Sequence, residues 1–127
     1  IIFHCVQQQL LHKRSTKQEQ LVEQIQEKIN RCYGDADFCL NQIAEELGRS
    51  PVYISRIYKQ QTMITIVDAL QRTRIEKACQ LLVETDWPVA DIAMQTGFAS
   101  TSYFHRMFKR ALGVTPTDYR RSRPISV

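Results

Sequence analysis

Two five-residue stretches carry the side chains best suited to bind a polyanion. Ser55–Lys59 reads SRIYK and His105–Lys109 reads HRMFK, so each has a polar residue, an arginine, an aliphatic residue, an aromatic residue and a lysine. On a helix, residues three apart share one side, so the arginine and lysine lie together while the apolar pair turns towards a core. An arginine can donate two hydrogen bonds to guanine in the major groove, and a lysine suits a phosphate oxygen. Both stretches therefore predict contacts with duplex DNA.

Each of these side chains also has a plainer interpretation. Arg56 and Arg106 could contact phosphate or form salt bridges, and Lys59 and Lys109 could be solvated surface lysines. His105 could contact a base or a phosphate, or could be polar surface.

The aromatic residues near the second stretch could form a base-stacking platform or a core. Phe104 and Phe108 are four residues apart on an expected helix, and Phe98 follows a glycine. This placement favours a core. The same assignment is made for four more residues: Leu81, Leu82, Trp87 and Tyr103.

The elements that position the two stretches are also repeated. Ala44 lies four residues before Gly48, and Ala93 lies four residues before Gly97. Alanine lets a second helix approach closely, and a glycine just past a helix end accepts the left-handed backbone that turns the chain. A repeat of this length is the signature of a duplicated structural unit. The sequence thus predicts two helix-turn-helix units.

Capping signals and apolar periodicity predict seven helices and no strand. Hydroxyl residues open five of them: Thr16, Ser50, Thr65, Ser100 and Thr115. The expected helices cover about 17–32, 40–47, 51–60, 66–84, 89–96, 101–112 and 116–121. We expect a linker or the tail of an upstream segment at 1–15, a first lobe at 16–64, a connecting helix at 65–86 and a second lobe at 87–127.

The connecting helix is expected to set the distance between the lobes. Roughly 20 residues at about 1.5 Å each give roughly 30 Å. This length is close to the ~34 Å between successive major-groove openings on one face of B-DNA. Arg72, Arg74 and Lys77 on this helix could touch the DNA backbone. Arg74 could instead pair with a carboxylate, and the candidates are Glu76, Glu84 and Asp91.

The distribution of charge favours a polyanionic partner. The 127 residues carry a net charge of +4. Residues 1–50 hold six Lys/Arg against seven Asp/Glu, whereas residues 51–127 hold eleven against six. The basic excess follows the two candidate DNA-binding stretches, although a membrane surface is a second polyanion to consider. No apolar run approaches the roughly 20 residues of a membrane span, and no signal peptide is evident, so a cytoplasmic location is expected.

The cysteines and histidines do not predict a metal site, a cofactor or an enzyme. Cys5, Cys32, Cys39 and Cys79 form no C-x-x-C pair, and the histidines have no H-x-x-x-H spacing. Cys32 and Cys79 fall on apolar helix faces, where a free cysteine behaves as a small hydrophobic residue.

With these elements in place, the chain resembles the DNA-binding domain of AraC/XylS-type transcriptional regulators over about residues 18–121. The resemblance is most specific at Ile92–Arg121 and extends to Ile43–Lys59. It implies an all-α, seven-helix fold in which a long helix bridges two helix-turn-helix lobes. It also implies sequence-specific binding near promoters, for instance as an activator, with RNA polymerase as a further partner. Control by a sensory or dimerisation domain outside this chain is expected.

The resemblance further implies which residues read bases. The positions fall on Val52, Ser55 and Arg56 in the first lobe, and on Thr101, Ser102, His105 and Arg106 in the second. Lys59 and Lys109 complete the expected DNA-binding set as phosphate contacts. The chain departs from the family at Met63, where glycine is common, at Ala69, where an aromatic residue is common, and at Cys39 and Pro88, where Ser or Thr is common.

Two other classes of function remain open at this stage. The chain could be the DNA-targeting arm of a larger enzyme, such as a repair methyltransferase whose reactive cysteine lies in a zinc cluster. It could also be a helical protein-interaction module. The module would not need arginines at matched positions in both repeats, and DNA binding at moderate salt would separate it from a regulator.

Overall fold

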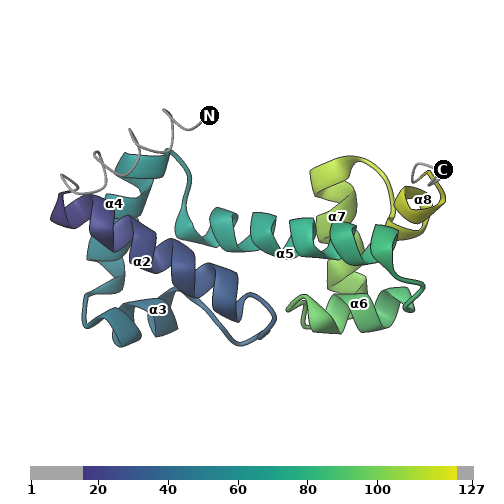
Figure 1. Ribbon diagram of the computed structural model, residues 1–127, viewed down its shortest axis with the longest axis horizontal. Coiled ribbons are helices and arrows are strands. Elements are labelled where there is room, and N and C mark those ends of the chain that lie inside the picture. Colours follow the sequence, from purple (N-terminus) through teal and green to yellow (C-terminus); the bar gives the residue numbers. More distant parts are fainter. Residues whose placement is uncertain (1–15, 123–127) are drawn as a thin grey trace, which may run out of the picture.

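The computed structural model describes residues 16–122, which form seven helices and no strand (Figure 1). The expected all-α fold is confirmed, whereas the expected segment at 1–15 lies outside the described residues. Two expected helix ends shift, because α4 continues to Thr62 and α6 stops at Gln95. The helices are α2 (Lys17–Cys32), α3 (Leu40–Leu47), α4 (Pro51–Thr62), α5 (Ile66–Glu84), α6 (Val89–Gln95), α7 (Thr101–Leu112) and α8 (Pro116–Arg121).

Hydroxyl caps begin five of these helices. In each, the side-chain oxygen of the capping residue accepts a hydrogen bond from the backbone N–H three residues later, at 3.0 to 3.1 Å. Such a bond satisfies a backbone donor that the helix itself cannot pair. The five capping residues are the predicted Thr16, Ser50, Thr65, Ser100 and Thr115. The helices after Cys39 and Pro88 have no side-chain cap.

A first hydrophobic cluster holds α2, α3 and α4 against the beginning of α5. Its fully buried members include Ile25, Ile43 and Ile54. Tyr58 is also buried, and its hydroxyl donates a hydrogen bond to Gln26 Oε1 on α2 at 2.7 Å. This bond lets a polar aromatic residue occupy the core, because a buried hydroxyl is costly only when it lacks a partner.

A second cluster holds α6, α7 and α8 against the end of α5. Phe98, Phe104 and Phe108 are buried and contact one another in series through tilted and edge-to-face rings, with centroids 4.9 and 5.6 Å apart. Their predicted role as core is confirmed. The prediction for Trp87 is wrong, because its side chain lies in the connection before α6 and is 44% exposed.

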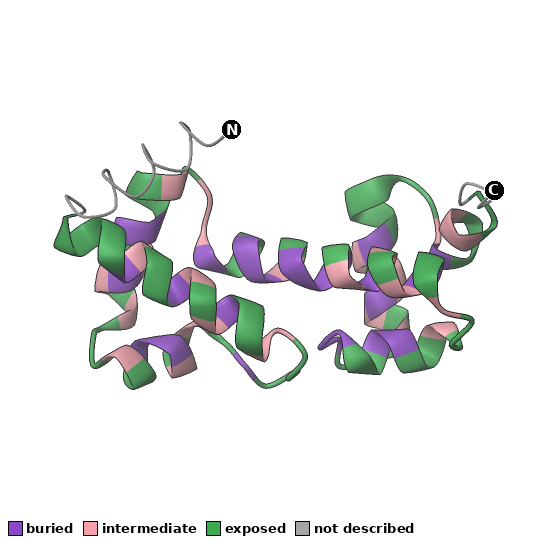
Figure 2. Ribbon diagram, in the orientation of Figure 1, coloured by how far each residue is buried: buried purple, intermediate pink, exposed green. Residues whose placement is uncertain are grey.

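The long helix α5 belongs to both clusters, and buried residues occur along its whole length (Figure 2). Ile66 and Leu70 pack in the first cluster, and Ile75 and Leu82 pack in the second. Ile66 and Ile75 are nine residues apart, which at 3.6 residues per turn is about two and a half turns. The two clusters therefore contact opposite sides of α5, and each half of the helix is amphipathic in a different direction.

Met63 occupies a backbone conformation that favours glycine. It closes α4 with φ 69°, and the equivalent cap of α7 is Gly113 with φ 77°. A residue with a Cβ pays about 1–2 kcal/mol in this left-handed region. Met63 recovers little of this cost by packing, since its side chain is 78% exposed.

Replacing Met63 by glycine is therefore expected to stabilise the domain. We expect Met63→Gly to raise the free energy of unfolding by about 0.5–1 kcal/mol, which is the relief of strain less the extra chain entropy of glycine. Urea denaturation measures this change as a higher midpoint at unchanged slope. Met63→Ala is the control, because it retains the Cβ and should give no gain. Equal midpoints for Met63→Gly and the parent would contradict the expectation.

Candidate nucleic-acid interface

Both predicted turns close with the same hydrogen bond. The N–H of Arg49 donates to the carbonyl of Ala44 at 3.0 Å, and the N–H of Phe98 donates to that of Ala93, also at 3.0 Å. Both alanines are buried. The turn glycines have φ values of 66° and 90°, the left-handed region that residues closing such turns adopt. The two copies are therefore helix-turn-helix units in structure as well as in sequence.

The two turns deliver α4 and α7 as the second helices of their units. In Figure 1, α4 lies beyond one end of α5, and α7 crosses α5 near the other end. Six of the predicted DNA-binding residues on these helices are exposed and three are partly exposed. The exposed ones are Val52, Arg56, Lys59, Ser102, Arg106 and Lys109, and the partly exposed ones are Ser55, Thr101 and His105.

A tyrosine holds the predicted base-reading arginine in each copy. The guanidinium carbon of Arg56 lies 5.6 Å from the centre of the Tyr53 ring, and that of Arg106 lies 5.7 Å from the Tyr103 ring. Stacking of this kind restricts the arginine side chain before any ligand arrives, which lowers the entropy cost of binding. The tyrosines lie three residues before the arginines in both copies, a repeat that the sequence interpretation did not use.

Arg49 is a second basic residue that the sequence interpretation missed. It is exposed in the turn between α3 and α4, and its guanidinium carbon lies 5.7 Å from the centre of the Tyr53 ring. The same ring contacts Arg56. Its position directly before the capping Ser50 could have identified it, since a basic residue beside the first turn of a DNA-reading helix lies close to phosphates.

His105 has a defined hydrogen-bonding state. Its Nδ1 lies 2.9 Å from the carbonyl oxygen of Thr101. A carbonyl oxygen can only accept, so Nδ1 carries a proton and donates. Nε2 is then an acceptor in the neutral ring and a donor in the charged ring. Nδ1 is therefore committed to the backbone of α7, and Nε2 is the ring nitrogen that a ligand could meet.

Two arginines bind backbone carbonyls of the protein itself. Arg74 donates to the backbone carbonyls of Tyr33 and Asp35 at 2.9 and 2.8 Å, so neither the contact with the DNA backbone nor the alternative pairing with a carboxylate is its role. Burial lowers the pKa of Arg74, but an arginine remains charged at neutral pH. Arg120 binds the carbonyls of Leu82 and Thr85 near the end of α5, at 3.1 and 3.2 Å. These two cations are therefore not available as phosphate contacts.

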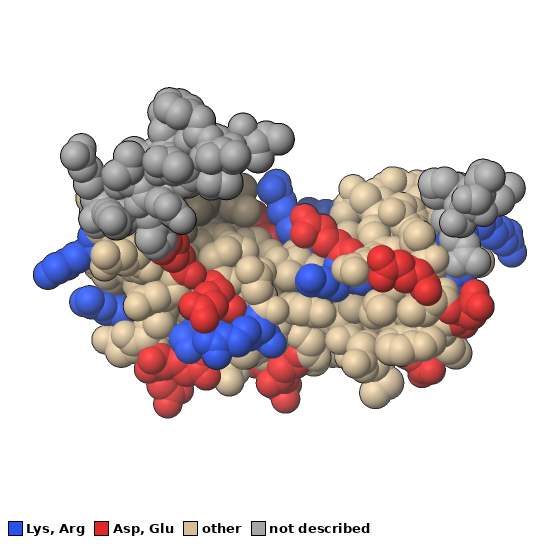
Figure 3. Space-filling model, in the orientation of Figure 1, with Lys and Arg blue, Asp and Glu red and all other residues tan. Residues whose placement is uncertain are grey.

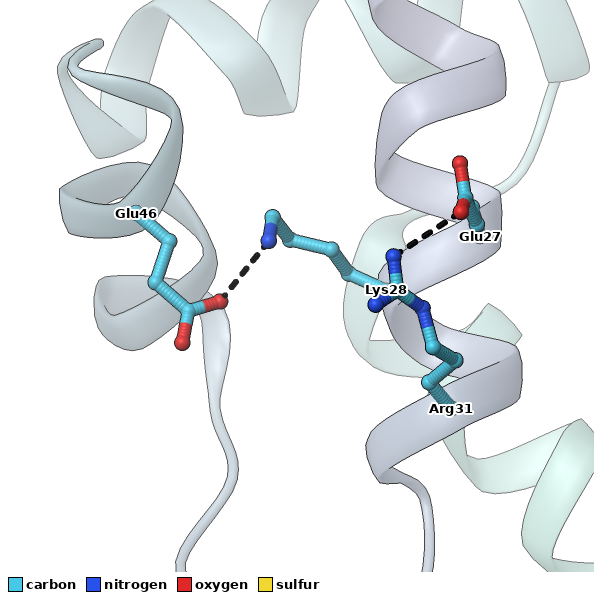
Figure 4. Close-up of polar contacts among 4 residues, drawn as sticks. All are labelled: Glu27, Lys28, Arg31 and Glu46. Carbon is cyan, nitrogen blue, oxygen red and sulfur yellow. Dashed lines mark hydrogen bonds and ion pairs between the residues drawn. The ribbon is translucent and has the colours of Figure 1, made fainter.

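The face that carries α2 and α5 is mixed in charge. In Figure 3, carboxylates lie among lysines and arginines across this face. Two ion pairs account for part of the mixture, Lys28 with Glu46 at 3.2 Å and Arg31 with Glu27 at 2.9 Å (Figure 4). Such pairs neutralise each other, so this face lacks the uniform positive charge that phosphate binding favours.

The described residues include neither a cluster of metal-ligating side chains nor a helix able to cross a membrane. Between residues 16 and 122, no three His, Cys, Asp or Glu side chains are placed to hold a metal ion. No helix in the same range has the length and apolar character to cross a bilayer. Cys79 packs against the second cluster, and burial raises the pKa of its thiol, which keeps it in the unreactive form.

Comparison with known proteins places this geometry in a family. Residues 43–122 match the family model of a helix-turn-helix domain. The chain is 36% identical over 123 residues to the "HTH-type transcriptional activator RhaR" of Mannheimia succiniciproducens, covering 94% of this chain and 43% of that protein. It is 31% identical over 100 residues to the "Bifunctional transcriptional activator/DNA repair enzyme AdaA" of Bacillus subtilis, covering 79% and 47%. The chain thus spans less than half the length of these curated relatives.

A solved structure agrees with the same assignment. The C-terminal domain of AraT, a response regulator from Geobacillus stearothermophilus, superposes with a TM-score of 0.83 at 38% identity. The match covers 87% of this chain and 92% of that domain. This chain therefore matches nearly the whole C-terminal domain of that response regulator. On these grounds the chain belongs to the AraC type of helix-turn-helix transcription regulators, as their DNA-binding domain.

Proposed function

We propose that the domain binds one duplex site by placing α4 and α7 in two successive major-groove segments. The observation that carries the proposal is the matched pair of exposed helices at the two ends of α5. The 19 residues of α5 span about 28 Å at 1.5 Å each, close to the ~34 Å between successive major-groove segments. Arg56 and Arg106, each stacked on a tyrosine, are assigned to guanine.

The remaining interface residues take complementary roles in this proposal. Val52 is 78% exposed and suits the methyl group of thymine. Lys59 and Lys109, one helical turn beyond the arginines, are assigned to phosphates. Four polar residues complete the base-reading set: Ser55, Thr101, Ser102 and His105.

The division into lobes and the partners are part of the same proposal. We assign the first lobe to 16–64, the connecting helix to 65–86 and the second lobe to 87–127, with 1–15 as the link to an upstream segment. Because the chain matches less than half of each curated relative, control by a sensory or dimerisation domain is assigned to the rest of the protein. RNA polymerase is assigned as a further partner, in line with the word activator in both relatives' names.

A DNA-targeting arm of a larger enzyme is the second candidate. One relative, AdaA, is named both an activator and a repair enzyme, which favours this alternative. Among the described residues, no cysteine lies in a cluster of side chains that could hold a zinc ion for such chemistry. A reactive, zinc-bound cysteine elsewhere in the same polypeptide would support the enzyme, and its absence from the full polypeptide would support the regulator.

Substitutions one helical turn apart separate base reading from phosphate binding. We expect Arg106→Ala to cost about 1–3 kcal/mol on the preferred site and to relax preference at one base position. Lys109→Ala should weaken binding to all sequences alike and make the log-log salt slope shallower by about 1.

The measurement is titration of both variants against the selected duplex and a scrambled duplex, after selection of the site from a random library. Arg72→Ala on α5 is a control, because this exposed arginine is assigned no base contact. Equal losses of Arg106→Ala on the selected and scrambled duplexes would remove Arg106 from the base-reading set.

A further inference from the structure

We infer that a direct contact between the two lobes fixes the distance and angle between the two DNA-reading helices. The contact, which we call the seam, is formed by Tyr33 and Gly34 after α2, Arg74 on α5, Gln95 at the end of α6, and Gly97 in the turn after it. Figure 1 shows the loop after α2 and the turn after α6 next to each other beneath α5. The inference rests on the proposed two-groove binding and adds the residues that set the spacing of the two half-sites.

The closest part of the seam is at Gly97. A Cβ at this position would lie 2.0 Å from the carbonyl oxygen of Tyr33 and 2.6 Å from Nε of Arg74. The backbones of the two lobes therefore approach within a distance that only glycine permits. Gly34 meets the second lobe less tightly, since a Cβ there would lie 3.0 Å from the carbonyl oxygen of Gln95.

The helix-turn-helix turn does not itself demand this close approach. Gly48, the turn glycine of the first copy, has no atom within 4 Å of the place where a Cβ would be. Both glycines have a positive φ, but only at Gly97 would a side chain also collide with a neighbouring segment. The second restriction at Gly97 comes from the other lobe.

Arg74 ties the seam together from the long helix. Its guanidinium donates to the carbonyls of Tyr33 at 2.9 Å, Asp35 at 2.8 Å and Phe38 at 3.4 Å, all in the loop after α2. Arg74 is 8% exposed, so these carbonyls replace its water. Lys77, one turn further along α5, lies 5.7 Å from the Tyr33 ring centre. The loop after α2 is thus held where the turn after α6 meets it.

The seam gives the lobes a second connection in addition to α5. The clusters lie on opposite sides of this helix, so a bend or twist of α5 alone would swing α7 relative to α4. A second contact at a distance from the helix axis opposes both motions. One base pair of added spacing moves a half-site by about 3.4 Å and rotates it by about 35° on the duplex. A domain fixed by the seam cannot follow such a change with both reading helices.

The test is the dependence of affinity on half-site spacing. The parent chain and its variants are titrated with duplexes carrying the selected half-sites at the selected spacing and at spacings one and two base pairs shorter or longer. We expect the parent to lose about 100-fold in affinity at a change of two base pairs, because one lobe then binds alone. Circular dichroism confirms that each variant is folded.

Gly97→Ala is the informative variant, because its Cβ forces the lobes apart. We expect the variant to bind the duplex with the selected spacing about tenfold more weakly than the parent does. Its affinity for the duplexes with altered spacing should be less than about threefold below its own affinity at the selected spacing. Gly113→Ala is its matched control, since this glycine has φ 77° in the same lobe but open space around it. The control should keep the spacing dependence of the parent. Arg74→Lys keeps the charge but loses the forked donors. Its spacing dependence should be weaker than that of Gly113→Ala and stronger than that of Gly97→Ala.

The outcomes separate the seam from the proposed function. If the parent prefers no selected duplex over a scrambled one, two-groove binding itself fails. If the parent binds the selected duplex but tolerates every spacing equally, two-groove binding stands and the seam inference is overturned. A folded Gly97→Ala with the spacing dependence of the parent also overturns the inference.

Discussion

Raising the salt concentration from about 50 to about 200 mM is expected to lower the affinity for the selected duplex about 10³- to 10⁵-fold. The expectation corresponds to roughly six to ten phosphates contacted by Lys and Arg, and to a log-log slope of about −5 to −9. Each contact releases condensed counterions from the DNA, and added salt opposes that release. Arg74 and Arg120 bind backbone carbonyls and are excluded from the contacting set.

Fluorescence titration at four salt concentrations between these limits gives the slope. Arg31→Ala is a suitable control, because Arg31 lies on α2 and is paired with Glu27, so its removal should leave the slope unchanged (Figure 4). Lys59→Ala on α4 should make the slope shallower by about 1. An affinity that stays constant across this range would contradict the proposed phosphate contacts.

Removing the central aromatic ring of the second cluster is expected to be the most destabilising single change. Phe104 is fully buried, and its ring contacts those of Phe98 at 4.9 Å and Phe108 at 5.6 Å between centroids. We expect Phe104→Ala to cost about 3–5 kcal/mol, because it removes buried apolar surface and leaves a cavity that its ring neighbours cannot fill. A domain with about 5–15 kcal/mol of stability would lose a large fraction of it.

Urea denaturation followed by circular dichroism measures this loss. Val52→Ala is the control, because Val52 is 78% exposed and should change the free energy of unfolding by less than about 0.5 kcal/mol. A Phe104→Ala variant with the midpoint of the parent would show that the second cluster repacks around the missing ring.

The helices were predictable because their determinants are local. A hydroxyl residue at a helix start pairs with an N–H three residues away, so Ser50 and Ser100 could be identified from the sequence alone. The core phenylalanines followed from helical periodicity in the same way. Trp87 was misassigned because it lies outside the helices, where periodicity says nothing about burial.

The contacts of Arg74 and Gly97 were not predictable by this route. Arg74 binds carbonyls about 40 residues earlier in the chain, and a backbone carbonyl has no signature in the sequence. The sequence therefore predicted that α5 alone sets the distance between the lobes. The close approach of Tyr33 to Gly97 depends on how the lobes meet in space, which no local pattern of residues specifies.

The two opposite apolar sides of α5 make the lobes thermodynamically dependent on each other. Ile66 and Leu70 complete one core, and Ala78 and Leu82 complete the other. Unfolding either lobe exposes its half of α5, and a helix that loses its packing on one half frays into the other. The domain should therefore melt as one cooperative unit. A chain cut in the middle of α5 would yield two fragments that each lack part of a core, so the duplicated reading units cannot be separated into independent modules.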